Sequence, residues 1–474
     1  MVSSFGIRAL LSRRCHRLGL GLATRATYSS QPFENDPICE LAASNLRFGP
    51  GSTAEVGADL KHVLSAERVV VFTDRNVRKL PCMQVLLESL ETNGISSVVI
   101  YDQVRVEPTD ASFQHAIDFL TNTVGTDNYD AVVALGGGST MDTAKAANLY
   151  AAFPPKGGFF DYVNPPVGKG LPVPAISQGS LPPLIAIPTT AGTGSETTGV
   201  AIFDDTKTQS KTGIANRRLK PTLGIVDPLN TLTQPREVAC YSGLDVLCHA
   251  IESYTALYFN KRPKPETPLQ RPTYQGSNPI SDIWALFALE TAAQNLQLAI
   301  SDPENEDARA KMLMASSAAG MGFGNAGVHL CHGMSYPVAS QCKSYTPASG
   351  YDTDHPIVPH GLSVFVNAPA VFRFTGVANP ERHRTCAQIL SGASTAPKSK
   401  QVADADVGLW LADELMELAV RLDVPMGLRT FGYTEEDIPS LVQGTLPQHR
   451  VTKISPRPVG QAELEDLFAD ALDE

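Results

Sequence analysis

A stretch of the sequence places a carboxylate and an imidazole at helical spacing. In residues 243–254, Asp245 and His249 stand four positions apart among apolar residues, so a helix would present both on one face. His332 and His360 follow at distances that suit the ends of other helices. One carboxylate with three imidazoles suits Fe(II) or Zn(II) with a position left for substrate. From the residues alone, each His is equally compatible with an ordinary core or loop position.

A second constellation has the pattern of a phosphate-binding turn. Residues 135–145 read Leu-Gly-Gly-Gly-Ser-Thr-Met-Asp-Thr-Ala-Lys, between an apolar run and an Ala-rich helical stretch. Glycines there let the backbone approach a ligand, and the N-terminus of the following helix favours an anion. A bare tight turn has the same sequence. Residues 187–196 form another Gly/Thr-rich loop with hydroxyls and backbone donors, which alone is also compatible with an ordinary turn.

Asp74 ends the apolar run that starts at Arg68. At the carboxyl end of a strand it could accept hydrogen bonds from a ribose diol. That position favours NAD over NADP, because the carboxylate would repel a 2′-phosphate. A helix N-cap is an equally good interpretation of Asp74.

The elements that must position these residues change type along the chain. Apolar runs alternate with helical stretches in the first half, at 68–74, 97–102, 130–135 and 184–187. Strands that are apolar throughout indicate a mostly parallel sheet covered on both faces, hence a doubly wound α/β nucleotide-binding domain. Further strand-like runs at 199–203 and 222–226 would continue that sheet.

After residue 228 the spacing of apolar residues becomes helical and no good strand remains. The expected helices cover 242–258, 282–300, 304–321, 401–422 and 461–473. We therefore predict an all-α metal-binding domain after the α/β domain. The expected division is a targeting segment at 1–33, a nucleotide-binding domain at 34–230 and a helical domain at 231–474.

Composition restricts the classes of function. The 474 residues carry a net charge of −11, and residues 1–33 contain five Arg and no acid, so the remainder has a net charge of −16. The strongly negative charge of this remainder argues against nucleic-acid binding. The sequence contains no uninterrupted apolar stretch of 18 residues, so we predict no membrane-spanning helix. The acid-free, Arg- and Ser-containing N-terminus is typical of a mitochondrial transit peptide, with a basic tail as the alternative. The eight scattered Cys predict neither a disulfide framework nor a Cys-based zinc site.

Four motifs in a shared order resemble the iron-containing (group III) alcohol dehydrogenase family. They are the Gly-Gly-Gly-Ser loop, Pro-Thr-Thr-Ala-Gly-Thr-Gly-Ser-Glu, Asp-x-x-x-His with Ala-Ile-Glu, and His-Gly-Met with a later Pro-His-Gly. The resemblance implies an α/β domain that holds NAD(H) and a helical domain that holds Fe(2+), with Zn(2+) as the alternative. It implies the metal ligands Asp245, His249, His332 and His360. It implies cofactor contacts from Asp74, Gly137, Gly138, Ser139, Asp142, Thr189, Thr190 and, near the ribose, Lys211.

Three segments, 271–282, 334–337 and 352–363, resemble a mitochondrial branch of that family more closely. This implies an oxidoreductase of the mitochondrial matrix that oxidises 4-hydroxybutanoate to succinate semialdehyde while 2-oxoglutarate is reduced to D-2-hydroxyglutarate. The nicotinamide would be retained through turnover. Alternatives are a metal-dependent alcohol dehydrogenase that releases NAD and a lyase of the dehydroquinate-synthase type. Small hydroxy and oxo acids are the expected partners, and a homo-oligomer is left open.

The sequence departs from the family pattern at Tyr336. Many members have a second His there, four residues after the third ligand, whereas a phenol is a weaker base at neutral pH. Tyr336 is a candidate proton relay or a packing residue, and His355 is a second catalytic candidate. The carboxylates of the implied substrates require a cation. Candidates are Arg262, Arg271 and Lys343, each also compatible with an ordinary surface charge.

Overall fold

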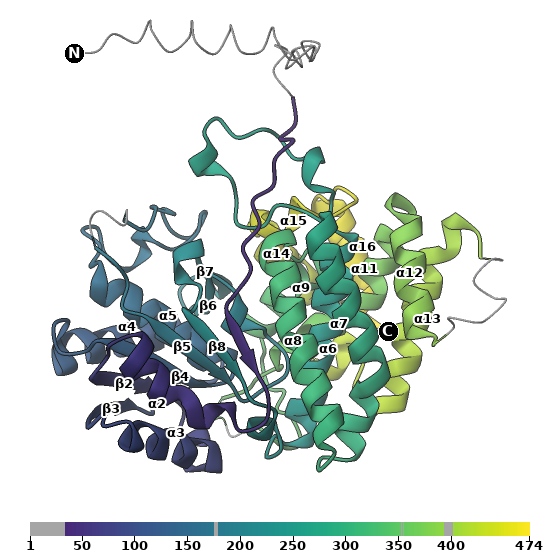
Figure 1. Cartoon of the computed structure of the whole chain (residues 1–474). Helices are drawn as coiled ribbons and strands as arrows, with labels where there is room; N and C mark the ends of the chain where they lie inside the picture. The colour runs from purple at the N-terminus through teal and green to yellow at the C-terminus, as the bar shows by residue number, and fades with distance from the viewer. Residues whose placement is uncertain (1–33, 175–178, 352, 354, 393–401) are drawn as a thin grey trace, which may run out of the picture.

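The computed structural model describes residues 34–174, 179–351, 353, 355–392 and 402–474. An α/β half lies beside a helical half, as the purple-to-teal and green-to-yellow parts of Figure 1 show. The predicted targeting segment 1–33 lies outside the described residues. The fold class predicted from the sequence is confirmed.

The described part of the α/β half is built on a six-stranded sheet in which every neighbouring pair is parallel. In spatial order its strands are β1 (Leu46–Phe48), β8 (Leu223–Val226), β5 (Leu184–Pro188), β4 (Ala131–Gly136), β2 (Arg68–Phe72) and β3 (Ser97–Tyr101). Parallel pairing requires crossover connections, which are helical up to β5, whereas β5 and β8 are joined through residues 189–222, which include a separate hairpin. The carboxyl ends of β2, β4 and β5 therefore share one edge of the sheet, at which Asp74, the Gly loop and the Thr-rich loop begin.

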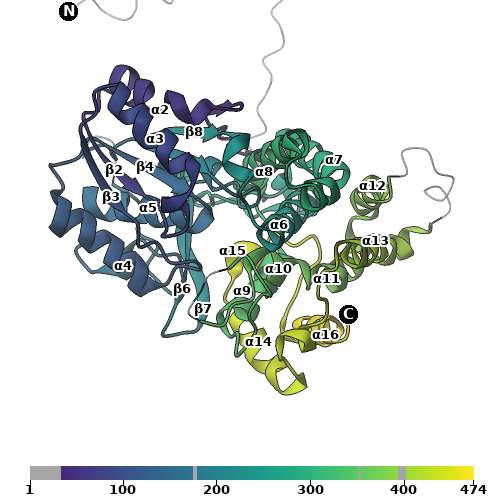
Figure 2. The same cartoon turned by 90° about the horizontal axis from the view of Figure 1, so that it is seen from below.

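Helices cover both faces of this sheet, as the view from below shows (Figure 2). On one face, Val69 and Val71 of β2 pack in a cluster with residues of α2 (Val56–Ala58) and α3 (Pro81–Thr92). Val70 and Phe72 pack instead with α4 (Asp110–Asp118) and α5 (Gly138–Ala152). Because alternate residues of a strand point to opposite faces, both sets must be apolar, which explains the uninterrupted apolar runs.

One predicted strand has a different partner from the one expected. The run 199–203 forms β6 (Val200–Asp205), which pairs antiparallel with β7 (Ser210–Ala215) in a separate two-stranded sheet. Gln209 adopts a left-handed conformation with φ of 48°, and the chain reverses over residues 206–209. The prediction that this run continues the main sheet was wrong, because the adjacent segment occupies its pairing edge.

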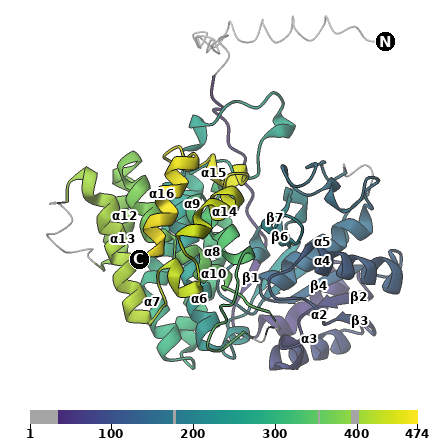
Figure 3. The same cartoon turned by 180° about the vertical axis from the view of Figure 1, so that it is seen from behind.

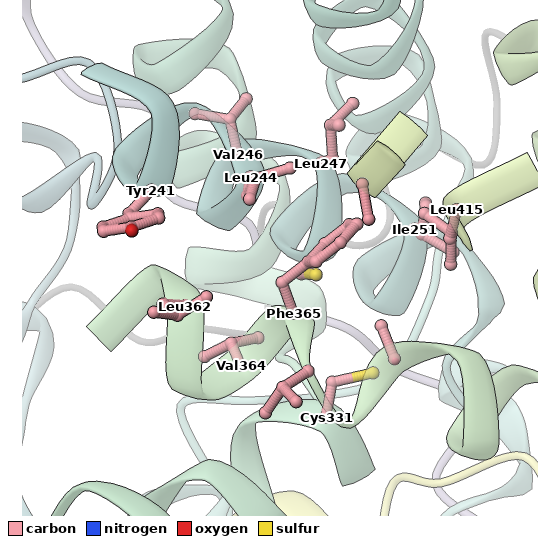
Figure 4. Close-up of a cluster of buried hydrophobic side chains, with 14 of the residues drawn as sticks. Tyr241, Leu244, Val246, Leu247, Ile251, Cys331, Leu362, Val364, Phe365 and Leu415 are labelled. Atoms are coloured by element: carbon pink, nitrogen blue, oxygen red, sulfur yellow. The ribbon is translucent and has the colours of Figure 1, made fainter. Parts of the chain in front are cut away.

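The helical half contains no strand among its described residues. Its helices are α6 (Arg236–Thr255), α7 (Pro279–Ser301), α8 (Glu306–Ala326), α9 (Leu330–Ser340), α10 (His360–Phe365), α11 (Ala368–Thr375), α12 (Pro380–Leu390), α13 (Val407–Leu422), α14 (Ile438–Thr445), α15 (His449–Thr452) and α16 (Gln461–Leu472). Figure 3 shows them from behind. Helix α6 lies in the centre of this half, where Leu244, Leu247 and Ile251 pack near Phe365 and Leu415 (Figure 4).

Residues His360–Ala378 have the length and hydropathy of a membrane-spanning helix. This stretch comprises α10, α11 and the turn after them, and 78% of its most apolar window is buried inside the protein. Its hydropathy is therefore that of a core segment packed against other helices.

The two halves meet through glycines. Gly194, in a left-handed conformation with φ of 57°, lies against Gly320 of α8. A Cβ on Gly320 would stand 2.3 Å from Thr197 Oγ1 and 2.7 Å from the Gly194 carbonyl oxygen. The Thr-rich loop therefore approaches α8 at a distance that no side chain on Gly320 would permit. Residues 36–44 also run along the helical half, where Glu40 and Ala42 donate backbone N–H groups to Gln275 and Asn325.

This contact predicts a difference between two glycines of the same helix. Gly320→Ala should lower the free energy of unfolding by about 1–3 kcal/mol, since backbone must move to admit the methyl group. Gly324→Ala is the matched control, because its Cβ would have a single neighbour at 3.6 Å and alanine favours helices. Chemical denaturation of both variants measures the difference. Equal stabilities would contradict the proposed role of the glycine contact.

Candidate metal and cofactor site

One face of α6 carries three polar side chains at spacings of four and three residues, Asp245, His249 and Glu252. All three are buried. Asp245 Oδ1 lies 3.6 Å from His249 Nε2, 3.4 Å from His332 Nε2 and 3.8 Å from His360 Nε2. The structure therefore brings together all four residues that the family resemblance implies as metal ligands.

Two other helices supply the remaining imidazoles through their first turns. His332 lies in the first turn of α9, and His360 is the first residue of α10, directly after Pro359. A Cβ on Gly361 would stand 1.9 Å from the Tyr241 carbonyl oxygen. Glycine at 361 is therefore required for α10 to lie close enough to α6 to place His360 beside Asp245.

Glu252 holds α9 and its imidazole in place. Its Oε1 accepts the backbone N–H of His329 at 3.0 Å and of Cys331 at 2.8 Å, and its Oε2 forms a short hydrogen bond with His332 Nδ1. A carboxylate at a helix N-terminus satisfies amides that lack an intrahelical partner. The bond to Nδ1 turns Nε2 of the same ring toward Asp245. The role of Glu252 was not predicted from the sequence, although this residue continues the Asp245–His249 stripe by one helical turn.

The cluster has the donor set and spacing of a divalent-metal site. Ligand atoms of Asp245, His249 and His332 lie within 4.8 Å of one another. Tetrahedral bonds of 2.0–2.1 Å would separate ligand atoms by about 3.4 Å. Asp245 Oδ1 and His332 Nε2 are buried without a hydrogen-bond partner in the structure. Buried polar atoms without partners are costly, so a cation between them fits the residues present.

The electrostatics keep the carboxylates charged. Burial by itself raises the pKa of the Asp245 carboxyl, but the surrounding imidazoles outweigh burial and lower it. Burial lowers the pKa of His249 to about 3, so this ring is neutral at physiological pH and retains a lone pair. Burial also lowers the pKa of His332, yet the nearby Glu252 and Asp245 carboxylates raise it to about 10. A metal at His332 Nε2 would compete directly with that proton.

Two adjoining cavities meet at this cluster. The smaller, of about 130 Å³, is lined by Asp245, His249, His332 and His360, among others. The larger, of about 650 Å³, lies at the carboxyl edge of the parallel sheet and has a volume suited to an organic cofactor. Asp245 and His360 line both cavities. A molecule in the larger cavity would therefore contact the same groups that surround the smaller one.

Most of the residues predicted to contact the cofactor line the larger cavity. Its lining includes Asp74, Gly137, Gly138, Ser139, Thr189 and Thr190. Helix α5 begins at Gly138, and no side chain caps its N-terminus. A Cβ on Gly138 would stand 2.6 Å from Thr193 Cγ2, so the Gly and Thr loops approach closely only with glycine. The unsubstituted backbone and the uncapped helix end fit a phosphate group.

Asp74 lies at the start of the turn after β2, at the wall of the larger cavity. Its Oδ1 accepts the backbone N–H groups of Asn76 at 2.8 Å and Val77 at 2.9 Å, which caps the turn Val77–Lys79. Both of these hydrogen bonds use Oδ1, and the residue also lines the larger cavity.

The other two predicted cofactor residues line the smaller cavity. Asp142 accepts the Ser195 hydroxyl at 2.6 Å and the backbone N–H of Ile202 at 2.9 Å. Lys211 is buried between Glu107, with which it forms a short ion pair, and Asp204 at 3.1 Å. Burial lowers the pKa of Lys211, but the two carboxylates outweigh it and raise the pKa. Lys211 therefore lines the smaller cavity together with the Asp–His cluster, whereas Asp74 lines the adjoining larger cavity.

The catalytic candidates occupy different positions. Tyr336 is buried and lines the smaller cavity, and its hydroxyl accepts a hydrogen bond from Arg450 Nη2 at 2.9 Å. His355 lines neither cavity. Arg450 was not identified from the sequence, because it lies in the four-residue helix α15, too short for a periodic signal.

The three cations proposed from the sequence for substrate carboxylates line neither cavity. Arg262 and Arg271 both form ion pairs with Asp36, at 3.1 and 2.9 Å. These ion pairs attach residues 36–44 to the helical half. Lys343 is about half exposed and pairs with Asp437. These three residues are close to the motifs in the sequence, but their side chains do not line the cavities at the Asp–His cluster.

Family models cover most of the described chain. Residues 43–228 match the model described as "Iron-containing alcohol dehydrogenase". Residues 273–472 match the model described as "Fe-containing alcohol dehydrogenase family, C-terminal". The first match ends just after β8, the second begins within the helical half, and α6 lies in the interval between them.

Individual proteins are similar over nearly the whole length. Hydroxyacid-oxoacid transhydrogenase, mitochondrial, of Mus musculus is 54% identical over 93% of this chain and 92% of its own. The protein of the same name from Homo sapiens is 52% identical over 97% of each chain. Among solved structures, a 1,3-propanediol oxidoreductase has a TM-score of 0.76 at 26% identity, covering 92% of this chain and all of its own. Sulfoacetaldehyde reductase from Bifidobacterium kashiwanohense, solved with NAD+, has a TM-score of 0.70 at 25% identity over 92% of this chain and 99% of its own.

The hydrogen bonds of Glu252 predict that it controls metal affinity without being a ligand. Glu252→Gln keeps the shape but removes the charge that orients His332, and should weaken metal binding by about 10- to 100-fold. His249→Ala and Asp245→Asn should lower both metal content and activity. His62→Ala, at an exposed position, is the control. Elemental analysis after dialysis against graded chelator concentrations measures the effect, and full occupancy in all the site variants would refute the assignment.

Proposed function

The chain belongs to the iron-containing alcohol dehydrogenase family, and we propose that within it the protein is a hydroxyacid-oxoacid transhydrogenase. The proposed reaction oxidises 4-hydroxybutanoate to succinate semialdehyde and reduces 2-oxoglutarate to D-2-hydroxyglutarate. The observation that carries the proposal is the junction of the two cavities at Asp245 and His360. A hydroxy acid beside the Asp–His cluster would lie next to a cofactor in the larger cavity.

We propose that Asp245, His249, His332 and His360 hold Fe(2+), with Zn(2+) as the alternative, and that the larger cavity holds NAD(H). When bound, the metal supplies a Lewis acid that lowers the pKa of an alcohol, and the nicotinamide supplies a hydride acceptor and donor. The family resemblance and the donor set support this assignment. Asp74 Oδ2 favours NAD over NADP, because a carboxylate repels a 2′-phosphate.

The chain's own residues would orient the substrate and exclude water. Glu252 fixes the His332 ring, and Gly361 keeps α10 against α6. We propose that Tyr336, in the wall of the smaller cavity, hydrogen-bonds the substrate through its hydroxyl. His355 is the less favoured catalytic candidate, because it lines neither cavity.

The proposed division of the chain is a targeting segment at 1–33, an NAD-binding domain at 34–230 and a metal-binding domain at 231–474. We propose that the protein acts in the mitochondrial matrix, since the names of relatives 53–55% identical to it include the word mitochondrial. Small hydroxy and oxo acids are its proposed partners.

Targeting predicts that residues 1–33 are dispensable for catalysis. A chain starting at Glu34 should keep its activity in vitro and fail to enter mitochondria in cells. The control replaces the five Arg of the segment by Gln in the full-length chain, which should also abolish import, since the basic character of the segment is what import machinery reads. Undiminished import of the truncated chain would contradict the proposal that residues 1–33 direct the protein to mitochondria.

Transhydrogenation predicts the path of a label. Deuterium at C4 of 4-hydroxybutanoate should appear at C2 of 2-hydroxyglutarate, with no label in added free NAD, since the nicotinamide is proposed to be retained. Mass spectrometry of both pools measures this. Label in the free NAD pool, or turnover that needs stoichiometric added NAD, would favour a dehydrogenase that releases its cofactor. Failure to oxidise any alcohol would favour the lyase alternative.

The glycine loop predicts a variant that separates the two binding sites. Gly138→Val should abolish both half-reactions, because its side chain would occupy the position 2.6 Å from Thr193 Cγ2 and block backbone approach to a phosphate. Metal content should be unchanged, since Gly138 does not contact the imidazoles. Parallel loss of metal would show that the substitution disturbs the fold instead.

A further inference from the structure

Arg450 places a guanidinium in the smaller cavity from the short helix α15. Its Nη2 donates to the Tyr336 hydroxyl at 2.9 Å, and its Cζ lies 4.8 Å from the centre of the Tyr274 ring. Its Nη1 is buried and has no hydrogen-bond partner in the structure. Two tyrosines thus hold the planar group in a fixed orientation with one donor unused.

The charge of Arg450 is not balanced by a carboxylate among the described residues, since its recorded partners are the two tyrosines. The acids of the same cavity are engaged elsewhere. Glu107 pairs with Lys211, Asp142 accepts from Ser195 and Ile202, and Asp245 lies among the imidazoles. A guanidinium nitrogen that is buried without a counter-charge or an acceptor is costly, so the Nη1 of this partly buried side chain fits an anionic ligand.

The proposed substrates share the fragment that such a cation would recognise. In 4-hydroxybutanoate the reacting carbon is followed by two methylene groups and a carboxylate. In 2-oxoglutarate the reacting carbonyl carbon is likewise followed by two methylene groups and a carboxylate. One cation at a fixed position relative to the Asp–His cluster would therefore serve both half-reactions.

We propose that Arg450 binds the carboxylate that lies two methylene groups beyond the reacting carbon, and so selects hydroxy and oxo acids over uncharged alcohols. This rests on the transhydrogenase function proposed above. A guanidinium binds a carboxylate through paired N–H donors, and a charge-assisted bond of this kind is strong in a cavity shielded from water. Tyr336 and Tyr274 act as positioning residues for Arg450, since each contacts its guanidinium.

Substrate pairs that differ only in the distal carboxylate test this assignment. For acceptors, 2-oxoglutarate is compared with 2-oxopentanoate, and for donors 4-hydroxybutanoate is compared with 1,4-butanediol, using the full-length metal- and cofactor-loaded protein. Arg450→Gln should raise KM for both carboxylate substrates by roughly 100-fold, as loss of a charge-assisted hydrogen bond does. KM for 2-oxopentanoate and 1,4-butanediol should change little. Arg450→Lys should recover part of the loss, because it restores the charge without the planar fork.

Lys343→Gln is the matched control, since this cation lines neither cavity and should leave every KM unchanged. Thermal unfolding checks that the Arg450 variants remain folded. Titration calorimetry with glutarate, an unreactive dicarboxylate, provides a second measurement that does not depend on turnover. The wild type should bind glutarate, and Arg450→Gln should lose this binding.

The two proposals fail in different ways. Glutarate binding that depends on Arg450, in a protein that does not couple the two acids, would contradict the transhydrogenase function and support the anion site. An active transhydrogenase whose Arg450→Gln variant keeps its KM for 2-oxoglutarate and its affinity for glutarate would overturn the role of Arg450.

Discussion

The burial of a polar stripe on the central helix is the constraint on which the rest of the structure depends. Asp245, His249 and Glu252 share one face of α6, inside the largest apolar core of the helical half. Buried carboxylates are tolerable only where opposite charge or N–H donors surround them. Glu252 is stabilised by backbone amides and His332, which fixes the start of α9. Asp245 is surrounded by the imidazoles of His249, His332 and His360. Its Oδ1 has no hydrogen-bond partner, and a cation bound between it and the imidazoles would supply one.

The same constraint explains why glycines occur where the helices and loops meet. His360 reaches Asp245 only because Gly361 lets α10 lie on the backbone of α6, and the Thr-rich loop reaches α8 through Gly194 and Gly320. The Gly361 contact joins two helices of the helical half beside the larger cavity, and the Gly194–Gly320 contact joins the α/β half to the helical half. The close approach of backbone segments at these glycines therefore sets the distance between the larger cavity and the Asp–His cluster.

The sequence predicted the features that depend on local patterns. Uninterrupted apolar runs predicted the parallel sheet, the i, i+4 pair predicted the polar face of α6, and the ordered motifs predicted the family. It failed where tertiary contacts decide. The run 199–203 pairs with β7 instead of the main sheet, because the local chain reversal competes successfully for its edge. Arg450 could not be found, since a helix of four residues has no periodicity and its significance lies in two tyrosines distant in sequence.

The charge of the whole protein and the charge of its cavity have opposite consequences for an acidic substrate. The body after residue 33 carries a net charge of −16, which opposes the approach of a dicarboxylate. At physiological ionic strength that repulsion is screened beyond about 8 Å, so distant surface acids contribute little to binding. A guanidinium with a buried Nη1 acts at close range, where screening is weaker, and its effect is correspondingly larger. Affinity for hydroxy and oxo acids therefore depends on one local cation whose charge the surrounding carboxylates leave free, and Lys211, neutralised by Glu107 and Asp204, cannot substitute for it.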